Sequence, residues 1–192
     1  MANGTLKVSN IQTSSGSGTI TLGQSGETVS VPSGATLDMS SGTMTLNSSM
    51  KATPAFSAIK SSQTTGQADA TWTKITYDTE LLDSDGKFAD SRFTPTVAGK
   101  YFVSLIATVG TSAASSVNQA SISVYKNGAQ ASTNFNNTCK VESEVELVIV
   151  TISGIIDLDA DDYIEGYVYI DRTTNTNRIT SSEFSAFKVI GA

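Results

Sequence analysis

The longest strand-like run of the sequence follows a Pro/Gly turn, and it limits what the chain can fold into. The turn spans residues 93–99, and the apolar run continues to Val109. Its side chains alternate between two faces, which is the periodicity of a β-strand. One face carries Tyr101, Val103, Leu105 and Ala107, and the other carries Phe102, Ser104, Ile106 and Thr108. Because both faces are mostly apolar, the pattern predicts a strand of a two-layer β-sandwich, with one face in the core and the other against a second subunit or layer.

The distribution of aromatic residues divides the chain into two parts. The first aromatic residue is Phe56, and residues 1–55 are dominated by Ser, Thr and Gly. Such a segment cannot bury a core of its own, because large side chains supply most of the free energy of burial. We therefore predict an N-terminal arm or stalk over residues 1–53, used for attachment or trimerisation, and a jelly-roll knob over residues 54–192.

A glycine repeat runs through the arm. Gly18, Gly26, Gly34 and Gly42 recur every eight residues, and a pair of apolar residues two positions apart follows each glycine. The pairs are Ile20 and Leu22, Val29 and Val31, Leu37 and Met39, and Met44 and Leu46. Turn-forming residues separate the pairs, so each octad predicts a short β-arm with one narrow apolar stripe. One stripe is unstable in water, and the repeat therefore predicts oligomerisation about an axis or docking onto a larger assembly; a flexible Ser/Gly linker is the alternative.

Strands and turns alternate through the knob. The predicted strands are residues 55–60, 70–78, 87–93, 99–109, 118–126, 129–138, 143–153, 163–171 and 182–190. Turns are predicted at residues 83–86, 126–128 and 160–162, where Asp, Asn and Gly gather. Residues 142–152 are the one ambiguous stretch, but alternation and β-branching favour a strand there. Nine strands at this spacing predict an all-β sandwich or jelly roll.

Five pieces of the knob occur in the order of a known module. They are the segment from Trp72 to Asp78, Asp85-Gly86-Lys87-Phe88, Phe93-Thr94-Pro95 with Gly99-Lys100-Tyr101, Lys126-Asn127-Gly128, and Phe184-Ser185-Ala186-Phe187. Over residues 54–190 the chain resembles the globular head of complement component 1q, a relative of tumour necrosis factor. That family is a jelly roll that forms tight homotrimers, often at the tip of a trimeric stalk. Val103 and Ala186 depart from its pattern, standing where the family often has Phe and Gly.

The resemblance implies a framework for the core and the trimer axis. Its residues are Trp72, Tyr77, Phe93, Gly99, Tyr101, Val103, Phe184 and Phe187. Tyr101 and Phe187 are expected to be largely buried, near the middle of the sandwich or at the trimer axis. The octads resemble the N-terminal sequences of tail-fibre and other structural proteins of tailed bacteriophages. An example is the segment Val31-Pro32-Ser33-Gly34-Ala35-Thr36-Leu37.

The composition leaves few routes to catalysis. The chain has no histidine, so it lacks the base of a Ser/His/Asp or Cys/His arrangement and the commonest metal ligand. Cys139 is the only cysteine and is expected to be structural or incidental. The sequence does not exclude a pair of catalytic carboxylates of the glycosidase kind, but it contains no insertion that could form a cleft around such a pair. We predict a protein that is not an enzyme and uses no cofactor.

Charge and ligand chemistry narrow the possible partners. A net charge of −6 argues against binding to nucleic acid, and no apolar run reaches transmembrane length. The densest acidic cluster consists of Asp157, Asp159, Asp161 and Asp162, whose carboxylates are weak candidates for a Ca²⁺ site. The favoured interpretation is that they lie on the solvent-exposed face of a strand that leads into a turn. Tyr163, Tyr167 and Tyr169 are expected to line strand faces, and a surface tyrosine there offers a ring on which a sugar could stack.

Three functional hypotheses follow. The first is a homotrimeric short fibre or spike of a tailed bacteriophage, assembled in the host cytoplasm, with the arm bound to other virion proteins and the knob bound to a host-surface glycan or protein. The second is a trimeric decoration protein that stabilises the capsid. The third is a soluble ligand-binding module of a cellular protein.

Overall fold

The computed structural model describes residues 9, 11–13, 18–46, 50–112 and 116–190. The chain divides into two units, Met1–Thr45 and Leu46–Ala192. The described residues contain no α-helix. The described part of the chain therefore has no helix long and apolar enough to cross a lipid bilayer.

The described part of the N-terminal unit is a series of turns. Hydrogen bonds close a turn from Gln24 to Glu27, a second from Pro32 to Ala35, and a third from Met39 to Gly42. Gly26 and Gly34 occupy the third position of the first two turns with φ of +87° and +83°, a conformation that glycine adopts without steric cost. The turns thus fall where the octads predict them. Residues 18–46 form no strand, however, and their apolar pairs are almost all exposed in the single chain.

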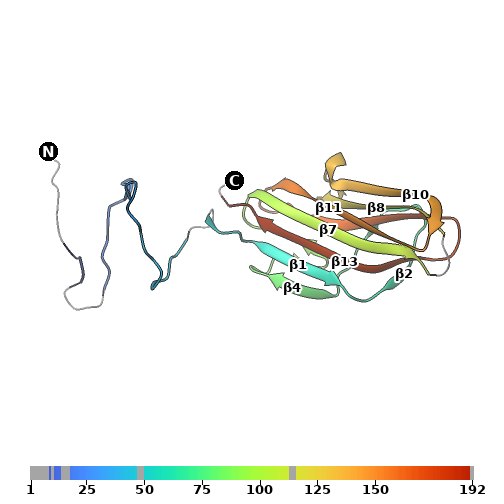
Figure 1. The fold of residues 1–192 in the computed structure, drawn as a ribbon, viewed down its shortest axis with the longest axis horizontal. Helices are drawn as coiled ribbons and strands as arrows, with labels where there is room; N and C mark the ends of the chain where they lie inside the picture. Colours follow the sequence, from blue (N-terminus) through green and yellow to red (C-terminus); the bar gives the residue numbers. More distant parts are fainter. Residues whose placement is uncertain (1–8, 10, 14–17, 47–49, 113–115, 191–192) are drawn as a thin grey trace. The chain divides into compact units, whose positions relative to one another are not determined.

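Two antiparallel sheets form the globular unit (Figure 1). Sheet A has the order β11-β7-β13-β1-β4, with β2 paired to β13. Its strands are β1 (Ala55–Lys60), β2 (Thr64–Gln67), β4 (Thr79–Asp83), β7 (Gly99–Thr111), β11 (Leu147–Leu158) and β13 (Asn177–Lys188). The long β7 pairs with both β11 and β13 along almost its whole length, so it is the central strand of the sheet.

Sheet B has the order β10-β8-β12-β6-β5, with β3 paired to β12 and β9 to β8. Its strands are β3 (Thr73–Lys74), β5 (Phe88–Ala89), β6 (Arg92–Phe93), β8 (Val117–Lys126), β9 (Ala129–Gln130), β10 (Asn136–Val145) and β12 (Ile164–Arg172). A short 3₁₀ helix, η2 (Thr133–Phe135), precedes β10. The two sheets pack face to face, which confirms the predicted all-β jelly-roll sandwich.

The core lies between the sheets. On β7, Tyr101, Val103, Leu105, Ala107 and Val109 are all fully buried, as the alternation of residues 99–109 predicts. Phe56 stacks on Phe88 and Phe93 and meets the ring of Phe184 edge-on. Burial of these large side chains is the main source of the free energy of folding, because each removes a wide apolar surface from water.

Four predicted strands are wrong in detail. Of residues 70–78 only Thr73–Lys74 form a strand, β3, and Ala70 has a φ of 47°, which is not a strand conformation. Residues 87–93 form the β5–β6 hairpin, which turns at Asp90 and Ser91 with φ of 52° and 58°. Residues 129–138 hold β9, η2 and the start of β10. Residues 143–153 cross from sheet B to sheet A at Glu146. The Glu146 carbonyl accepts the Thr111 N–H and lies against Gly110, where a Cβ would collide with it. These contacts are distant in sequence, so local alternation cannot predict the crossing.

Candidate binding surfaces

The acidic loop between β11 and β12 is organised by hydrogen bonds and ion pairs. Lys100 Nζ lies 2.6 Å from Asp157 Oδ1, and Lys126 Nζ lies 2.7 Å from Asp162 Oδ2. Asn127 Nδ2 and the Asp159 N–H also donate to Asp162. The described residues contain no group of three or more carboxylate, cysteine or histidine ligands that could hold a metal. The four predicted aspartates therefore do not converge, and two of them bind cationic side chains instead.

These contacts change the acidity of Asp162. The hydrogen bond from Lys126, followed by those from Asn127 and the Asp159 N–H, lowers the pKa of Asp162 from its ordinary 3.8 to about 2. Asn127, with φ of 53°, and Gly128, with φ of 81°, form the tight turn between β8 and β9. The predicted Lys126-Asn127-Gly128 turn thus also anchors the acidic loop.

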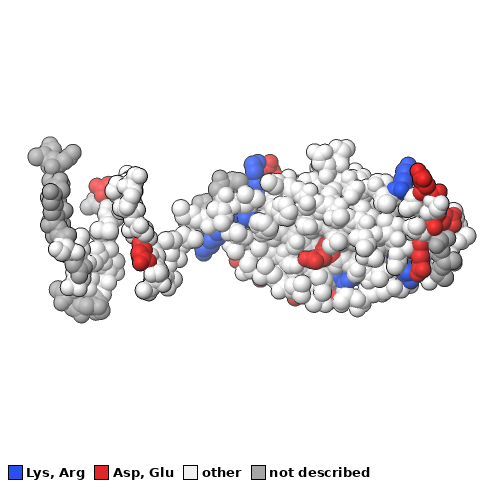
Figure 2. All heavy atoms as spheres, viewed as in Figure 1, with Lys and Arg blue, Asp and Glu red and all other residues white. Residues whose placement is uncertain are grey.

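The outer face of sheet A is apolar. The antiparallel register places Ile155, Phe102 and Phe187 in one row across β11, β7 and β13. Further along the face lie Ile106, Ile149 and Leu147. In the isolated chain Phe187 is 45% exposed, Ile155 58% and Ile149 65%. Figure 2 shows that many charged side chains gather toward the two ends of the globular unit and that one acidic patch lies near its middle. On the outer side of β13, exposed Glu183 lies opposite Ile106.

A groove of about 320 Å³ opens on the same face. It runs between the end of β1, the middle of β7 and a bulge of β13. Its lining includes the apolar Ile59 and Ile106 and the charged Lys60 and Glu183. Ser182 beneath it donates to the Ile106 carbonyl at 2.7 Å. A row of serines, Ser153, Ser104 and Ser185, lies between the apolar row and the groove. We call this whole outer surface of sheet A the apolar face.

The outer face of sheet B carries aromatic rings. Trp72 lies 5.6 Å from Tyr169 and 6.1 Å from Tyr125, measured between ring centroids. Tyr125 stacks on Tyr167 at 3.9 Å with an interplanar angle of 23°. All four rings are half-buried. We call Trp72, Tyr125, Tyr167 and Tyr169 the aromatic platform.

An ion-pair cluster around buried Glu165 lies beside the platform, because the register places Glu165 opposite Tyr125. Glu165, whose side chain is 4% exposed, accepts hydrogen bonds from Lys74 Nζ at 2.7 Å and from Arg92 Nε at 2.9 Å. The Arg92 guanidinium also lies 3.9 Å from the centroid of the Tyr163 ring, in a cation–π contact. Burial alone would raise the pKa of Glu165, but the hydrogen bonds and charges of Lys74 and Arg92 outweigh it and lower that pKa.

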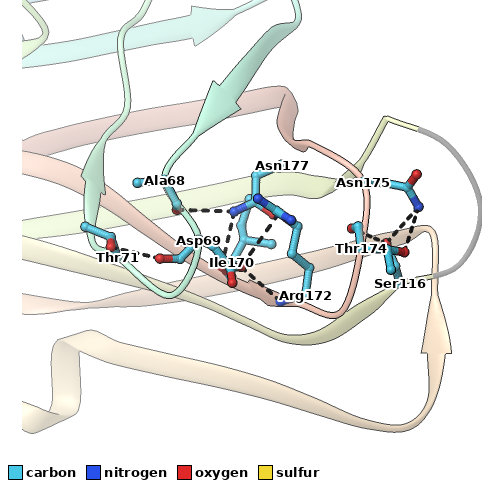
Figure 3. Close-up of polar contacts among 9 residues, drawn as sticks. All are labelled: Ala68, Asp69, Thr71, Ser116, Ile170, Arg172, Thr174, Asn175 and Asn177. Carbon is cyan, nitrogen blue, oxygen red and sulfur yellow. Dashed lines mark hydrogen bonds and ion pairs between the residues drawn. The ribbon is translucent and has the colours of Figure 1, made fainter.

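A third polar group ties the loops at one end of the sandwich together (Figure 3). The amide of fully buried Asn177 donates to the carbonyls of Ala68 and Ile170. Asp69 accepts the N–H of Arg172, and Ser116 donates to the Thr174 carbonyl. These contacts join strands of both sheets, so the group is structural.

Most of the predicted framework residues lie in or against the core of the sandwich. Phe93, Tyr101, Val103 and Phe184 are fully buried in the core, and Gly99 begins β7 with φ of 150°. The Tyr101 hydroxyl donates to the Val97 carbonyl at 2.6 Å, and burial raises the pKa of Tyr101 to about 12. Burial likewise raises the pKa of Tyr77, whose hydroxyl lies against Gly166.

Two framework residues lie on the surface. Trp72 belongs to the aromatic platform, not to the core. Phe187 is wrong as a sandwich-core residue, because its position on β13 turns it outward while Phe184, Ala186 and Lys188 are buried. Its placement at a trimer axis stays a prediction. Cys139 is half-buried and packs against the core.

The sequence analysis missed several surface residues. Glu165, Lys74 and Arg92 were not predicted as a cluster, because they come from three strands far apart in sequence. The outward side chains Ile149 and Ile155 were detectable: each stands in an alternating run where a sandwich strand exposed to water usually has a polar residue.

The fold and its surfaces define an all-β jelly-roll sandwich. A solved structure of similar fold is the globular domain of zebrafish complement 1qA protein, with a TM-score of 0.50 and 17% sequence identity over 71% of this chain and 97% of that chain. At this identity the likeness establishes the fold alone, and it confirms the predicted complement-1q-like jelly roll. No protein-family model and no curated protein matches the sequence.

Proposed function

We propose that this protein is a non-enzymatic homotrimer that attaches one structure to another, with the globular unit as a binding knob. The observation that carries the proposal is the apolar face of sheet A, where Phe187, Ile155 and Ile149 are exposed in the isolated chain. Contiguous apolar surface of this kind marks a protein interface, because leaving it in water costs free energy. Trimers are the assembly implied by the resemblance to the complement 1q head, and closed three-fold symmetry covers the face in every copy.

The N-terminal unit is the attachment segment in this proposal. Its turns repeat at the octad glycines, and its apolar pairs have no partner strand within the described residues of the chain. Three copies brought together by the knob would place these pairs side by side and allow them to bury one another. Docking of the same pairs along a larger assembly would bury them equally well.

The resemblance of the octads to tail-fibre proteins supports a place on the virion of a tailed bacteriophage. We assign the protein to a short fibre or spike, bound to other virion proteins through its N-terminal segment and to the host surface through its knob. Because the apolar pairs also suit docking along a shell, capsid decoration is the second candidate.

The location of the protein on intact particles tests the assignment. Gold-labelled antibody against the knob is expected at the tail or as projecting spikes, and purified protein is expected to compete with particles for adsorption to host cells. Uniform labelling of the shell, without competition for adsorption, would replace the fibre with the decoration protein. Release of reducing ends from host polysaccharide by the purified protein would contradict the non-enzymatic assignment.

A further inference from the structure

We infer that the aromatic platform on sheet B is a glycan-binding site in which a neutral sugar ring stacks on Trp72. This inference rests on the proposed function and specifies the partner of the knob. Four large aromatic side chains that lie together on a strand surface and keep part of their area in water are unusual for a purely structural sheet face. Their arrangement and their polar neighbours point to the class of ligand.

The ring geometry leaves Trp72 available for stacking. Tyr125 and Tyr167 cover one face of each other, because their rings are nearly parallel at 3.9 Å. The indole of Trp72 is tilted by 58° from Tyr125 and by 50° from Tyr169, so neither tyrosine stacks on its flat face. The tilted contacts help to hold the indole in place, and part of it stays in water. The exposed part of the indole offers an apolar surface against which the C–H face of a pyranose ring can lie.

Hydroxyl and amide groups surround the rings. Ser121 and Ser123 are buried beneath the platform, and the register places them opposite Tyr169 and Tyr167. Gln130 Nε2 donates to Ser123 Oγ at 3.1 Å, and the Ser121 hydroxyl contacts Thr138 Oγ1 at 2.9 Å. Gln130 and Thr138 are exposed. The exposed Gln130 and Thr138 keep donor or acceptor capacity beyond these contacts, which sugar hydroxyls, being both donors and acceptors, can use.

The charges near the platform favour a neutral ligand. Glu165 holds both Lys74 and Arg92, and Arg92 also lies against the Tyr163 ring. The cations are thus already engaged by the protein. The net charge of −6 on the whole chain disfavours a polyanionic partner. An apolar protein segment is also a poor fit, because serine, threonine and glutamine side chains interrupt the aromatic surface.

The platform stays accessible in the proposed trimer. It lies on the outer face of sheet B, whereas the apolar face lies on the outer side of sheet A. Contacts between copies through sheet A would therefore leave three platforms per trimer open. Single hydroxyl and amide contacts are weak, so each platform alone binds weakly, and three linked sites gain through their high effective concentration.

The fluorescence of Trp72 can report sugar binding directly, because Trp72 is the only tryptophan of the chain. The full-length protein is titrated with maltohexaose, cellohexaose, tri-N-acetylchitotriose and mannotriose while the tryptophan emission is recorded. We expect at least one sugar to shift the emission to shorter wavelength and to protect Trp72 from acrylamide quenching, with a dissociation constant on the order of 1 mM. No change in emission or in quenching with any of the four overturns the inference.

Variants separate a binding role from a packing role. We expect Tyr169→Ala to weaken sugar binding about tenfold and Gln130→Ala about fivefold. Gln63→Ala, an exposed glutamine outside the platform, is the matched control and is expected to bind as the wild type. Trp72→Phe, measured by calorimetry, is expected to lose most of the binding. Thermal unfolding and sedimentation of each variant establish that it remains folded and assembled; folded Tyr169→Ala and Gln130→Ala proteins with wild-type affinity would overturn the inference.

Adsorption to host cells distinguishes this inference from the proposed function. Periodate treatment of the cells, which cleaves sugar diols, is expected to abolish adsorption of the wild-type protein, whereas protease treatment is expected to leave it intact. If the Tyr169→Ala protein adsorbs as well as the wild type, or if protease alone abolishes adsorption, the glycan site is wrong and the attachment function stands. If sugars bind at Trp72 but the protein is a monomer, the trimer is wrong and the glycan site stands.

Discussion

Phe102 on β7 and Phe187 on β13 lie directly opposite each other on the outer face of sheet A, with their ring centroids 5.4 Å apart. Such an aromatic pair contributes about 0.5–1.5 kcal/mol beyond its buried area, but here nearly half of Phe187 remains in water. Ile155 extends the row on β11. The pair is therefore placed where a second copy of the chain would complete its burial, and this relationship underlies the proposed trimer.

The two parts of the chain are expected to differ in their ability to fold. A fragment beginning at Lys51 retains the core around Phe56 and should keep a cooperative thermal transition. The fragment of residues 1–50 carries no aromatic side chain and should show none. Circular dichroism during heating measures both. Loss of the transition when the first fifty residues are removed would contradict the two-part organisation.

Tyr101 tests the core of the sandwich. We expect Tyr101→Ala to lower the free energy of unfolding by about 3–5 kcal/mol, because the ring is fully buried against Phe93. Tyr101→Phe removes only the hydrogen bond to the Val97 carbonyl and should cost about 1 kcal/mol. Urea unfolding gives both values. Equal costs for the two variants would show that the ring contributes little.

Glu165 tests the ion-pair cluster beside the aromatic platform. Glu165→Ala removes the carboxylate that Lys74 and Arg92 share, and because both cations can still reach water we expect a loss of about 1.5–3 kcal/mol. Asp157→Asn is the matched control, because it breaks the exposed pair with Lys100 and should cost about 0–1 kcal/mol. Urea unfolding at pH 7 compares the two. A Glu165→Ala protein as stable as the control would refute the assigned role.

Asp162 predicts a dependence of stability on pH. Its folded-state pKa of about 2 lies below the ordinary 3.8, so its stabilising contribution is present above pH 3.8 and is lost as the pH falls toward 2. In the Asp162→Asn protein the melting temperature should start lower at pH 7 and fall less between pH 4 and pH 2 than in the wild type. Other carboxylates contribute equally to both proteins. Parallel melting curves over this window would argue against the Lys126 and Asn127 contacts.

The sequence was most informative where a pattern is local. Alternation over residues 99–109 predicted the inward and outward faces of β7, and Asn127-Gly128 predicted its turn because few residues adopt positive φ. The crossing at Glu146 was missed, since contacts with Thr111 and Gly110 far along the chain determine it. Phe187 was misplaced for a related reason: its direction depends on the register of β13 against β7. The aromatic platform was missed for the same reason, because Trp72 meets Tyr169 only after β3 pairs with β12.

Sedimentation velocity at micromolar concentration tests the central claim most directly. The wild-type protein is expected to sediment as one species near three times the chain mass of 20.0 kDa. Ile155→Asp places a charge in the apolar face and should shift the species toward the single-chain mass, whereas Thr138→Asp, on the exposed surface of β10, should remain a trimer. A folded wild-type monomer, or an Ile155→Asp protein that remains a trimer, would contradict assembly through the apolar face of sheet A.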